Sequence, residues 1–135
     1  MVNKIWIRRI NDKTKKFYKL KDKDVGENSK SKIKKLSKIL IKNKIDLQFI
    51  SAPENIAWLL NLRGADSEFA PIPNSYLIIN NQNKAYLFCD LTKITKKLKK
   101  DLDGNLIVID IKYIEKFILK IVNKNVRNMM FFFYV

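Results

Sequence analysis

The sequence contains no histidine and a single cysteine, Cys89. Serine and cysteine nucleophiles in hydrolases are usually activated by an imidazole, and catalytic zinc and two-metal peptidase sites usually include a histidine ligand. One cysteine cannot close an internal disulfide or form a CxxC pair. These absences exclude the common hydrolase and zinc centres from this sequence. They favour a reducing, cytoplasmic setting, with Cys89 as a small buried side chain on a strand.

Long uncharged segments are also missing. No run approaches the roughly 20 apolar residues of a membrane span, and Ile5 to Ile7 is too short for the core of a signal peptide. We therefore expect no secretory leader and no membrane partner. Glycine and proline are scarce, at three each, whereas apolar residues make up 47% of the 135 residues. This composition predicts a single globular domain rather than a disordered chain.

Acidic residues are few: 13 Asp or Glu stand against 28 Lys or Arg, for a formal net charge of +15. Such a charge suits a nucleic acid, because neutralising phosphates supplies most non-specific affinity. However, the basic residues are 24 lysines and only four arginines, whereas arginine recognises bases and phosphates through its bidentate fork. We interpret the charge mainly as a solvated lysine-rich surface and keep nucleic-acid binding as a less favoured alternative.

Hydrophobic spacing predicts alternating helices and strands. The expected elements are a helix from an N-cap at Ser29 to about Asn43, a strand over 45–51, a helix opening at Pro53, hairpin strands at 76–79 and 85–89, a helix through 91–102, a strand over 106–111 and a helix through 114–121. In the first helix the apolar stripe runs through Ile33, Leu36, Ile39 and Leu40, and Lys32 is assigned to the solvated side. The order predicts an α/β fold, a mixed sheet flanked by helices on both faces.

The apolar segments carry further expectations. The helix after Pro53 is apolar almost all round, so it should be largely buried with Trp58 in the core, and Leu106 to Ile111 should be a fully covered strand. We divide the chain into a lead-in or linker at residues 1–28, the α/β domain at 29–123 and an atypical apolar tail at 124–135. For this tail we favour a shifted reading frame over a docking peptide, because it lacks helical spacing and resembles an aggregation hazard.

A block of nine residues from Ile56 to Gly64 reads Ile-Ala-Trp-Leu-Leu-Asn-Leu-Arg-Gly. It closely resembles a segment in the middle domain of the three-domain Xaa-Pro aminopeptidases, the aminopeptidase P family of the M24 peptidase type. The passage from Val25 to Ile33 and the second hairpin strand, 85–90, are similar to the same domain. The resemblance runs from about Ile5 to about Val122 and implies the creatinase/prolidase N-terminal type of α/β fold.

The resemblance also implies where catalysis takes place in the family. Activity belongs to a separate pita-bread domain, in which two Asp, one His and two Glu hold two divalent metals, usually manganese. None of those motifs occurs in this sequence, so no catalytic, cofactor-binding or metal residue is carried over. We expect the chain alone to be inactive. Its expected role is to support dimer contacts and substrate access to a catalytic domain that it lacks.

Arg63 and Asp66 are the candidate site residues. In the family, the loop after the Trp58 helix faces the active-site cleft or the dimer partner, so the resemblance implies a role for both residues in substrate access or at an interface. The structural alternative is that they pair with each other or cap the helix end. The expected partners are a second copy of the chain or a separately encoded catalytic chain that restores peptidase activity.

Overall fold

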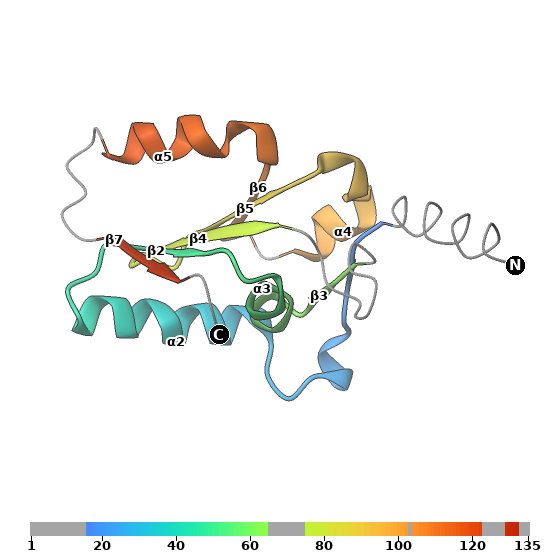
Figure 1. The fold of residues 1–135 in the computed structure, drawn as a ribbon. Coiled ribbons are helices and arrows are strands. Elements are labelled where there is room, and N and C mark those ends of the chain that lie inside the picture. Colours follow the sequence, from blue (N-terminus) through green and yellow to red (C-terminus); the bar gives the residue numbers. More distant parts are fainter. Residues whose placement is uncertain (1–15, 65–74, 103, 123–128, 133–135) are drawn as a thin grey trace, which may run out of the picture.

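A five-stranded mixed sheet, in the order β6-β5-β4-β2-β7, forms the middle layer of the protein (Figure 1). The computed structural model describes residues 16–64, 75–102, 104–122 and 129–132. The strands are β1 (Tyr18–Lys19), β2 (Leu47–Ile50), β3 (Leu62–Arg63), β4 (Tyr76–Asn80), β5 (Ala85–Cys89), β6 (Leu106–Asp110) and β7 (Met129–Phe132). The α-helices are α2 (Ser29–Lys42), α3 (Pro53–Leu60), α4 (Lys96–Asp101) and α5 (Ile114–Val122), and 3-10 turns occupy Asp22–Asp24, Leu91–Lys93 and Ile111–Tyr113.

The hairpin β4–β5 lies at the centre of this sheet. The two strands pair antiparallel, with Leu77 opposite Leu87. In the connecting turn, the Asn80 side chain accepts hydrogen bonds from the backbone N–H groups of Gln82 and Lys84, both at 2.9 Å. The predicted hairpin is confirmed, and Cys89 at its end is fully buried, as expected.

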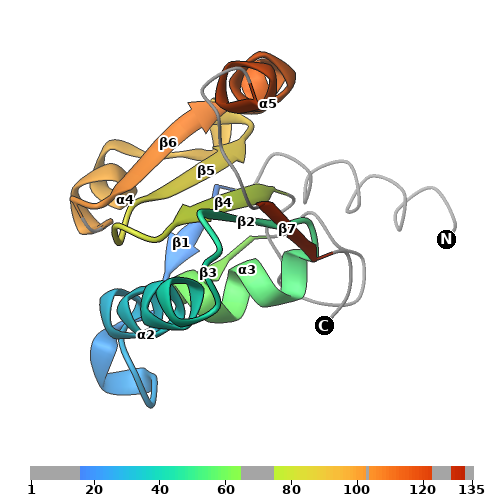
Figure 2. The same cartoon turned by 90° about the vertical axis from the view of Figure 1, so that its left-hand side faces the viewer.

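Alternate side chains of the sheet enter two separate cores. On one face, Leu77 and Leu87 pack with buried residues of α2, α3 and α4. On the other face, Ile78 and Phe88 pack against α5. Figure 2 shows the resulting layers, with α5 on one side of the sheet and α2 and α3 on the other. The predicted α/β class, a mixed sheet with helices on both faces, is confirmed.

The outer strands of the sheet differ from expectation. The sequence predicted an atypical apolar tail at 124–135 and no strand there, whereas Met129–Phe132 forms β7, which pairs parallel to β2. In the described part of the chain β6 pairs only with β5, so it is an edge strand, and Ile107 is 42% exposed. The prediction of a fully covered strand over 106–111 is therefore wrong.

Local capping explains two further differences between the predicted and the observed helices. Asn28, not Ser29, is the N-cap of α2, because its side chain accepts a hydrogen bond from Ser31 N at 2.8 Å. The helix expected through 91–102 is divided into a 3-10 turn and the short α4. Asp90 caps the turn by accepting from Thr92 N at 3.0 Å, and Thr95 caps α4 by accepting from Leu98 N at 3.0 Å.

The segment before α2 is attached to the domain. Phe17 is a core side chain on the α2 and α3 face of the sheet, and its N–H donates to Lys93 O at 2.9 Å. The next residues form β1, which pairs antiparallel with β3. At least residues 17–19 are therefore part of the packed structure. The boundaries proposed at 28/29 and 123/124 stay predictions.

The central sheet position of Leu87 gives a direct test of this core. Leu87→Ala should lower the free energy of unfolding by about 2–5 kcal/mol, because it deletes a fully buried side chain and leaves a cavity. Leu119→Ala, at an exposed position of α5, should change it by no more than about 0.5 kcal/mol. Urea unfolding followed by circular dichroism measures both, and equal losses would contradict the assigned core.

Candidate functional site

Helix α3 presents one side to the core and one to solvent. Ile56, Leu59 and Leu60 are buried, whereas Trp58 is 60% exposed. At about 100° per residue, position 58 lies about 200° from both 56 and 60, which is nearly the opposite side of the helix. The expectation that Trp58 lies in the core is wrong, because a short surface helix buries only the side that faces the sheet.

Lys32 of α2 is buried beneath this helix end, at 7% exposure. Its Nζ donates to Trp58 O at 2.6 Å and to Asn61 Oδ1 at 2.7 Å, and it lies 4.2 Å from the centroid of the Trp58 ring. The last carbonyls of a helix have no helical partner and carry partial negative charge, so a cation is favourable there. The assignment of Lys32 to the solvated side of α2 is therefore wrong.

Burial and two neighbouring charges act on the pKa of Lys32. Burial lowers the pKa of Lys32 below the usual lysine value, the nearby Glu27 carboxylate opposes this shift, and the charge of Arg63 adds to it. Glu27 itself accepts hydrogen bonds from Lys35 and Ser31, both at 2.6 Å. These bonds, with that of Lys35 the stronger influence, lower the pKa of the Glu27 carboxyl.

Asn61 ends α3 and connects it to two other segments. Its backbone is left-handed, with φ of 52°, a conformation that asparagine tolerates better than most residues. Its side-chain amide donates to Glu27 O at 3.1 Å, and its own backbone oxygen accepts from Leu20 N at 2.8 Å. The two segments that carry the family resemblance, Val25 to Ile33 and Ile56 to Gly64, therefore meet around Lys32 and Asn61.

Arg63 follows on β3, where it lies opposite Tyr18 of β1. Its Nη1 donates to Ala57 O at 2.8 Å and to Leu62 O at 2.9 Å. The first bond caps the end of α3, in agreement with the structural alternative for this residue. Asp66 lies outside the described residues, so its pairing with Arg63 and the role of both residues in substrate access stay predictions.

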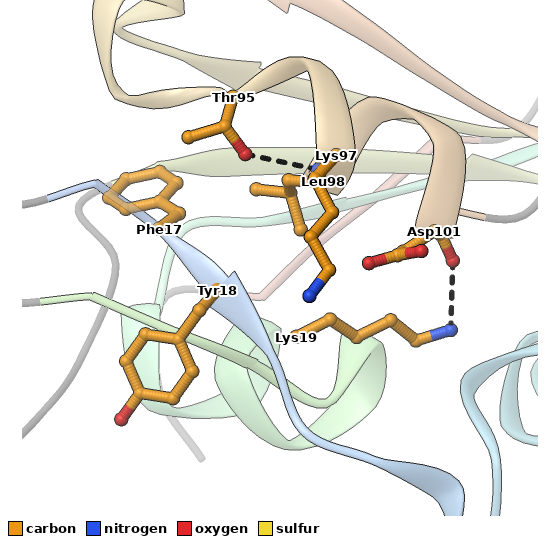
Figure 3. Close-up of a pocket in the computed structure, with 7 residues that line it drawn as sticks. All are labelled: Phe17, Tyr18, Lys19, Thr95, Lys97, Leu98 and Asp101. Carbon is orange, nitrogen blue, oxygen red and sulfur yellow. Dashed lines mark hydrogen bonds between the residues drawn. The ribbon is translucent and has the colours of Figure 1, made fainter.

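The described chain also has pockets, among them one beside α4 and one beside α5. The smaller has a volume of about 120 Å³ and lies between β1 and α4, with Phe17 and Leu98 in its lining (Figure 3). There Lys19 Nζ donates to Asp101 O at 3.2 Å. Pockets for drug-sized ligands measure about 300–1,000 Å³, so this one is too small for a peptide.

The wider pocket, of about 400 Å³, lies between the β4–β5 turn and α5. Each pocket has a single carboxylate residue in its lining, Asp101 in the smaller and Asp46 in the wider one, so neither provides a carboxylate pair for acid and base catalysis.

The residues described here do not fit a dinuclear metal centre. Among them, no three Cys, Asp or Glu side chains gather in a group that could hold a metal ion, and the sequence has no histidine. None of the described helices has the length and apolar character needed to cross a membrane.

Asn61 can be tested against a second left-handed asparagine, Asn83, with φ of 64° in the hairpin turn. Asn61→Gly keeps the backbone conformation accessible but removes the amide that bonds Lys32 and Glu27 O. It should lower the free energy of unfolding by about 1–3 kcal/mol, because buried polar partners lose a hydrogen bond. Asn83→Gly should change it by no more than about 0.5 kcal/mol. Urea unfolding measures both variants. Similar losses of unfolding free energy would show that the hydrogen bonds of the Asn61 side chain do not stabilise the fold.

Comparisons with known proteins agree with the fold. The family model described as Creatinase/Prolidase N-terminal domain matches residues 8–131. Xaa-Pro aminopeptidase 1 of Dictyostelium discoideum is 38% identical over 89 residues, which are 66% of this chain and 14% of that protein. A probable Xaa-Pro aminopeptidase P of Coccidioides posadasii is 42% identical over 77 residues, or 57% of this chain and 12% of that protein. The chain thus spans only a small part of these relatives.

Solved structures show the same architecture. The X-prolyl aminopeptidase of Caenorhabditis elegans, described as a cytosolic enzyme with a di-nuclear active site, superposes with a TM-score of 0.76 at 23% identity over 81% of this chain and 18% of its own. An aminopeptidase P from Streptococcus thermophilus gives a TM-score of 0.55 at 18% identity, over 76% of this chain and 73% of its own. At these identities the likeness concerns the fold. The match over residues 8–131, together with this architecture, shows that the chain belongs to the creatinase/prolidase N-terminal domain family.

Proposed function

We propose that the chain acts as the non-catalytic domain of a Xaa-Pro aminopeptidase and packs against a metal-dependent catalytic domain. The relatives that the chain matches support this role: they are Xaa-Pro aminopeptidases, of which it covers 12 to 14%.

The observation that carries the proposal is a group of three residues around α3 and β3, Tyr18, Trp58 and Arg63, here called the Trp58 surface. Trp58 and Tyr18 are both more than half exposed. Arg63 lies opposite Tyr18 in the β1–β3 pair and bonds the carbonyl next to Trp58 in sequence. Tryptophan, tyrosine and arginine are the residue types enriched at the energetic centres of protein interfaces, whereas lysine is depleted there. On a chain with 24 lysines, this surface stands out as the one to face a partner domain.

Arg63 has a second capacity at such an interface. A guanidinium has five N–H donors, and the two bonds to Ala57 O and Leu62 O use only Nη1. A carboxylate of the catalytic domain, or of a second copy across a dimer, would pair with the same group in a bidentate fashion. Placed at the mouth of the catalytic cleft, the Trp58 surface would then limit access to peptides of the right shape.

A chimera tests this proposal. In it, the present chain replaces the matching segment of the Dictyostelium discoideum enzyme, and hydrolysis of an X-Pro-Y peptide is measured with manganese. The chimera should be active and the isolated chain inactive. Trp58→Ala in the chimera should lower kcat/KM at least about tenfold, since truncating a central aromatic anchor typically costs 2 kcal/mol or more.

Tyr113→Ala provides the matched control, because Tyr113 is an exposed aromatic residue next to α5 and away from the Trp58 surface. It should leave kcat/KM within about twofold of the unmodified chimera. Genuine turnover by the isolated chain would refute the non-catalytic role. Equal effects of the Trp58 and Tyr113 substitutions in folded chimeras would refute the assigned surface.

A further inference from the structure

Lys32 places a charged group at a buried position. An apolar side chain at this position would have a smaller desolvation cost. Its ammonium is removed from water and therefore needs partners. The partners of the ammonium in the structure all belong to the end of α3. They are Trp58 O at 2.6 Å, Asn61 Oδ1 at 2.7 Å and the centroid of the Trp58 ring at 4.2 Å. The cation thus contacts both the backbone and the side chain of Trp58.

The position of the Trp58 ring depends on these contacts. An indole that is 60% exposed has little side-chain packing to hold it, so its orientation must come from the contacts on its inner face. A lysine ammonium within about 6 Å of a ring centroid attracts the ring through its quadrupole, and the attraction grows when the cation is desolvated. Lys32 satisfies both conditions, because it is close to the ring and buried.

The charged groups around Lys32 are Glu27, in the segment before α2, and Arg63 on β3. The Glu27 carboxylate is bonded to Lys35 and Ser31, and the Arg63 guanidinium is bonded to Ala57 O and Leu62 O. Neither bond set includes Lys32. Within the described part of the chain, the ammonium is thus balanced by a helix carbonyl, an amide oxygen and a ring rather than by a salt bridge.

We propose that Lys32 is the positioning residue of the Trp58 surface, and that its buried ammonium fixes the orientation of the Trp58 indole that a partner domain meets. The effect on partner binding rests on the function proposed above. The effect on the ring does not, because it is a property of the isolated chain. Lys32 acts through Trp58 and is not expected to touch a substrate.

The first experiment follows the environment of the Trp58 ring by fluorine NMR. The chain is labelled with 5-fluorotryptophan in a Trp6→Phe background, so that Trp58 gives the sole fluorine NMR resonance. Because burial lowers the pKa of Lys32, this resonance should shift with a midpoint below the usual lysine pKa as the pH is raised. Lys32→Met should abolish the titration and change the shift at neutral pH, and Lys32→Arg should retain a neutral-pH shift close to the original.

Lys34→Met is the matched control, since Lys34 is an exposed lysine on the same helix. It should leave both the shift and the titration unchanged. If Lys32→Met does not fold, the pH titration of the unsubstituted chain still decides the matter. A Trp58 resonance that does not titrate with pH, or that is the same in the Lys32→Met and Lys34→Met variants, would overturn the proposal.

The second experiment measures the consequence in the peptidase chimera. Lys32→Met should lower kcat/KM about tenfold, with Lys32→Arg restoring most of it and Lys34→Met without effect. A Trp58 resonance that depends on Lys32, combined with a chimera insensitive to both Trp58→Ala and Lys32→Met, would uphold the positioning role and refute the proposed interface. A resonance independent of Lys32 would refute the positioning role whatever the chimera does.

Discussion

The bonds of the Lys32 ammonium join α2 to the end of α3 and, through Asn61, to the segment around Glu27 and Leu20. These bonds thereby hold together three segments: the start of α2, the end of α3 and the chain around Leu20 and Glu27. Because a buried ammonium without acceptors would be costly, the left-handed turn at Asn61 and the direction of its amide are constrained together. The exposed indole of Trp58 and the bond from Arg63 to Ala57 O depend on the same helix end.

The rest of the domain supplies a rigid base for this point. The central hairpin β4–β5 is buried on both faces, by α2, α3 and α4 on one side and by α5 on the other. Helix α3 packs its Ile56, Leu59 and Leu60 side chains into the first of these cores. A surface mounted on a packed helix holds its geometry better than one on a loop, and this suits a domain whose proposed work is to meet another domain.

The sequence predicted the elements that depend on local patterning. The hairpin strands, the helix that opens at Pro53 and the mixed sheet follow from side-chain periodicity and from turn and capping residues, which act over a few positions. Strand β7 was missed, because its partner β2 is distant in the chain and nothing in Met129–Phe132 itself specifies a parallel neighbour. The edge position of β6 was missed for the same reason.

The candidate site was predictable only in part. Arg63 was found through the family resemblance, whereas Lys32 and Asn61 interact across 29 positions and carry no local motif. One signal was present: Lys32 shares the spacing of Ser29, Ile33, Ser37 and Leu40, which are all buried on α2. That stripe is obscured in the sequence because Ile39, which is exposed, continues the apolar spacing of Ile33 and Leu36. Trp58 was expected in the core but is exposed, because apolar composition does not tell which side of a short helix faces solvent.

The central claim is that the Trp58 surface meets a catalytic domain. Hydrogen–deuterium exchange tests it most directly, by comparing the isolated chain with the chimera that contains a catalytic domain. The account predicts slower exchange of the amides of residues 56–63 in the chimera, with those of residues 114–121 on α5 unchanged. Unchanged exchange at 56–63, or slowing confined to α5, would contradict it.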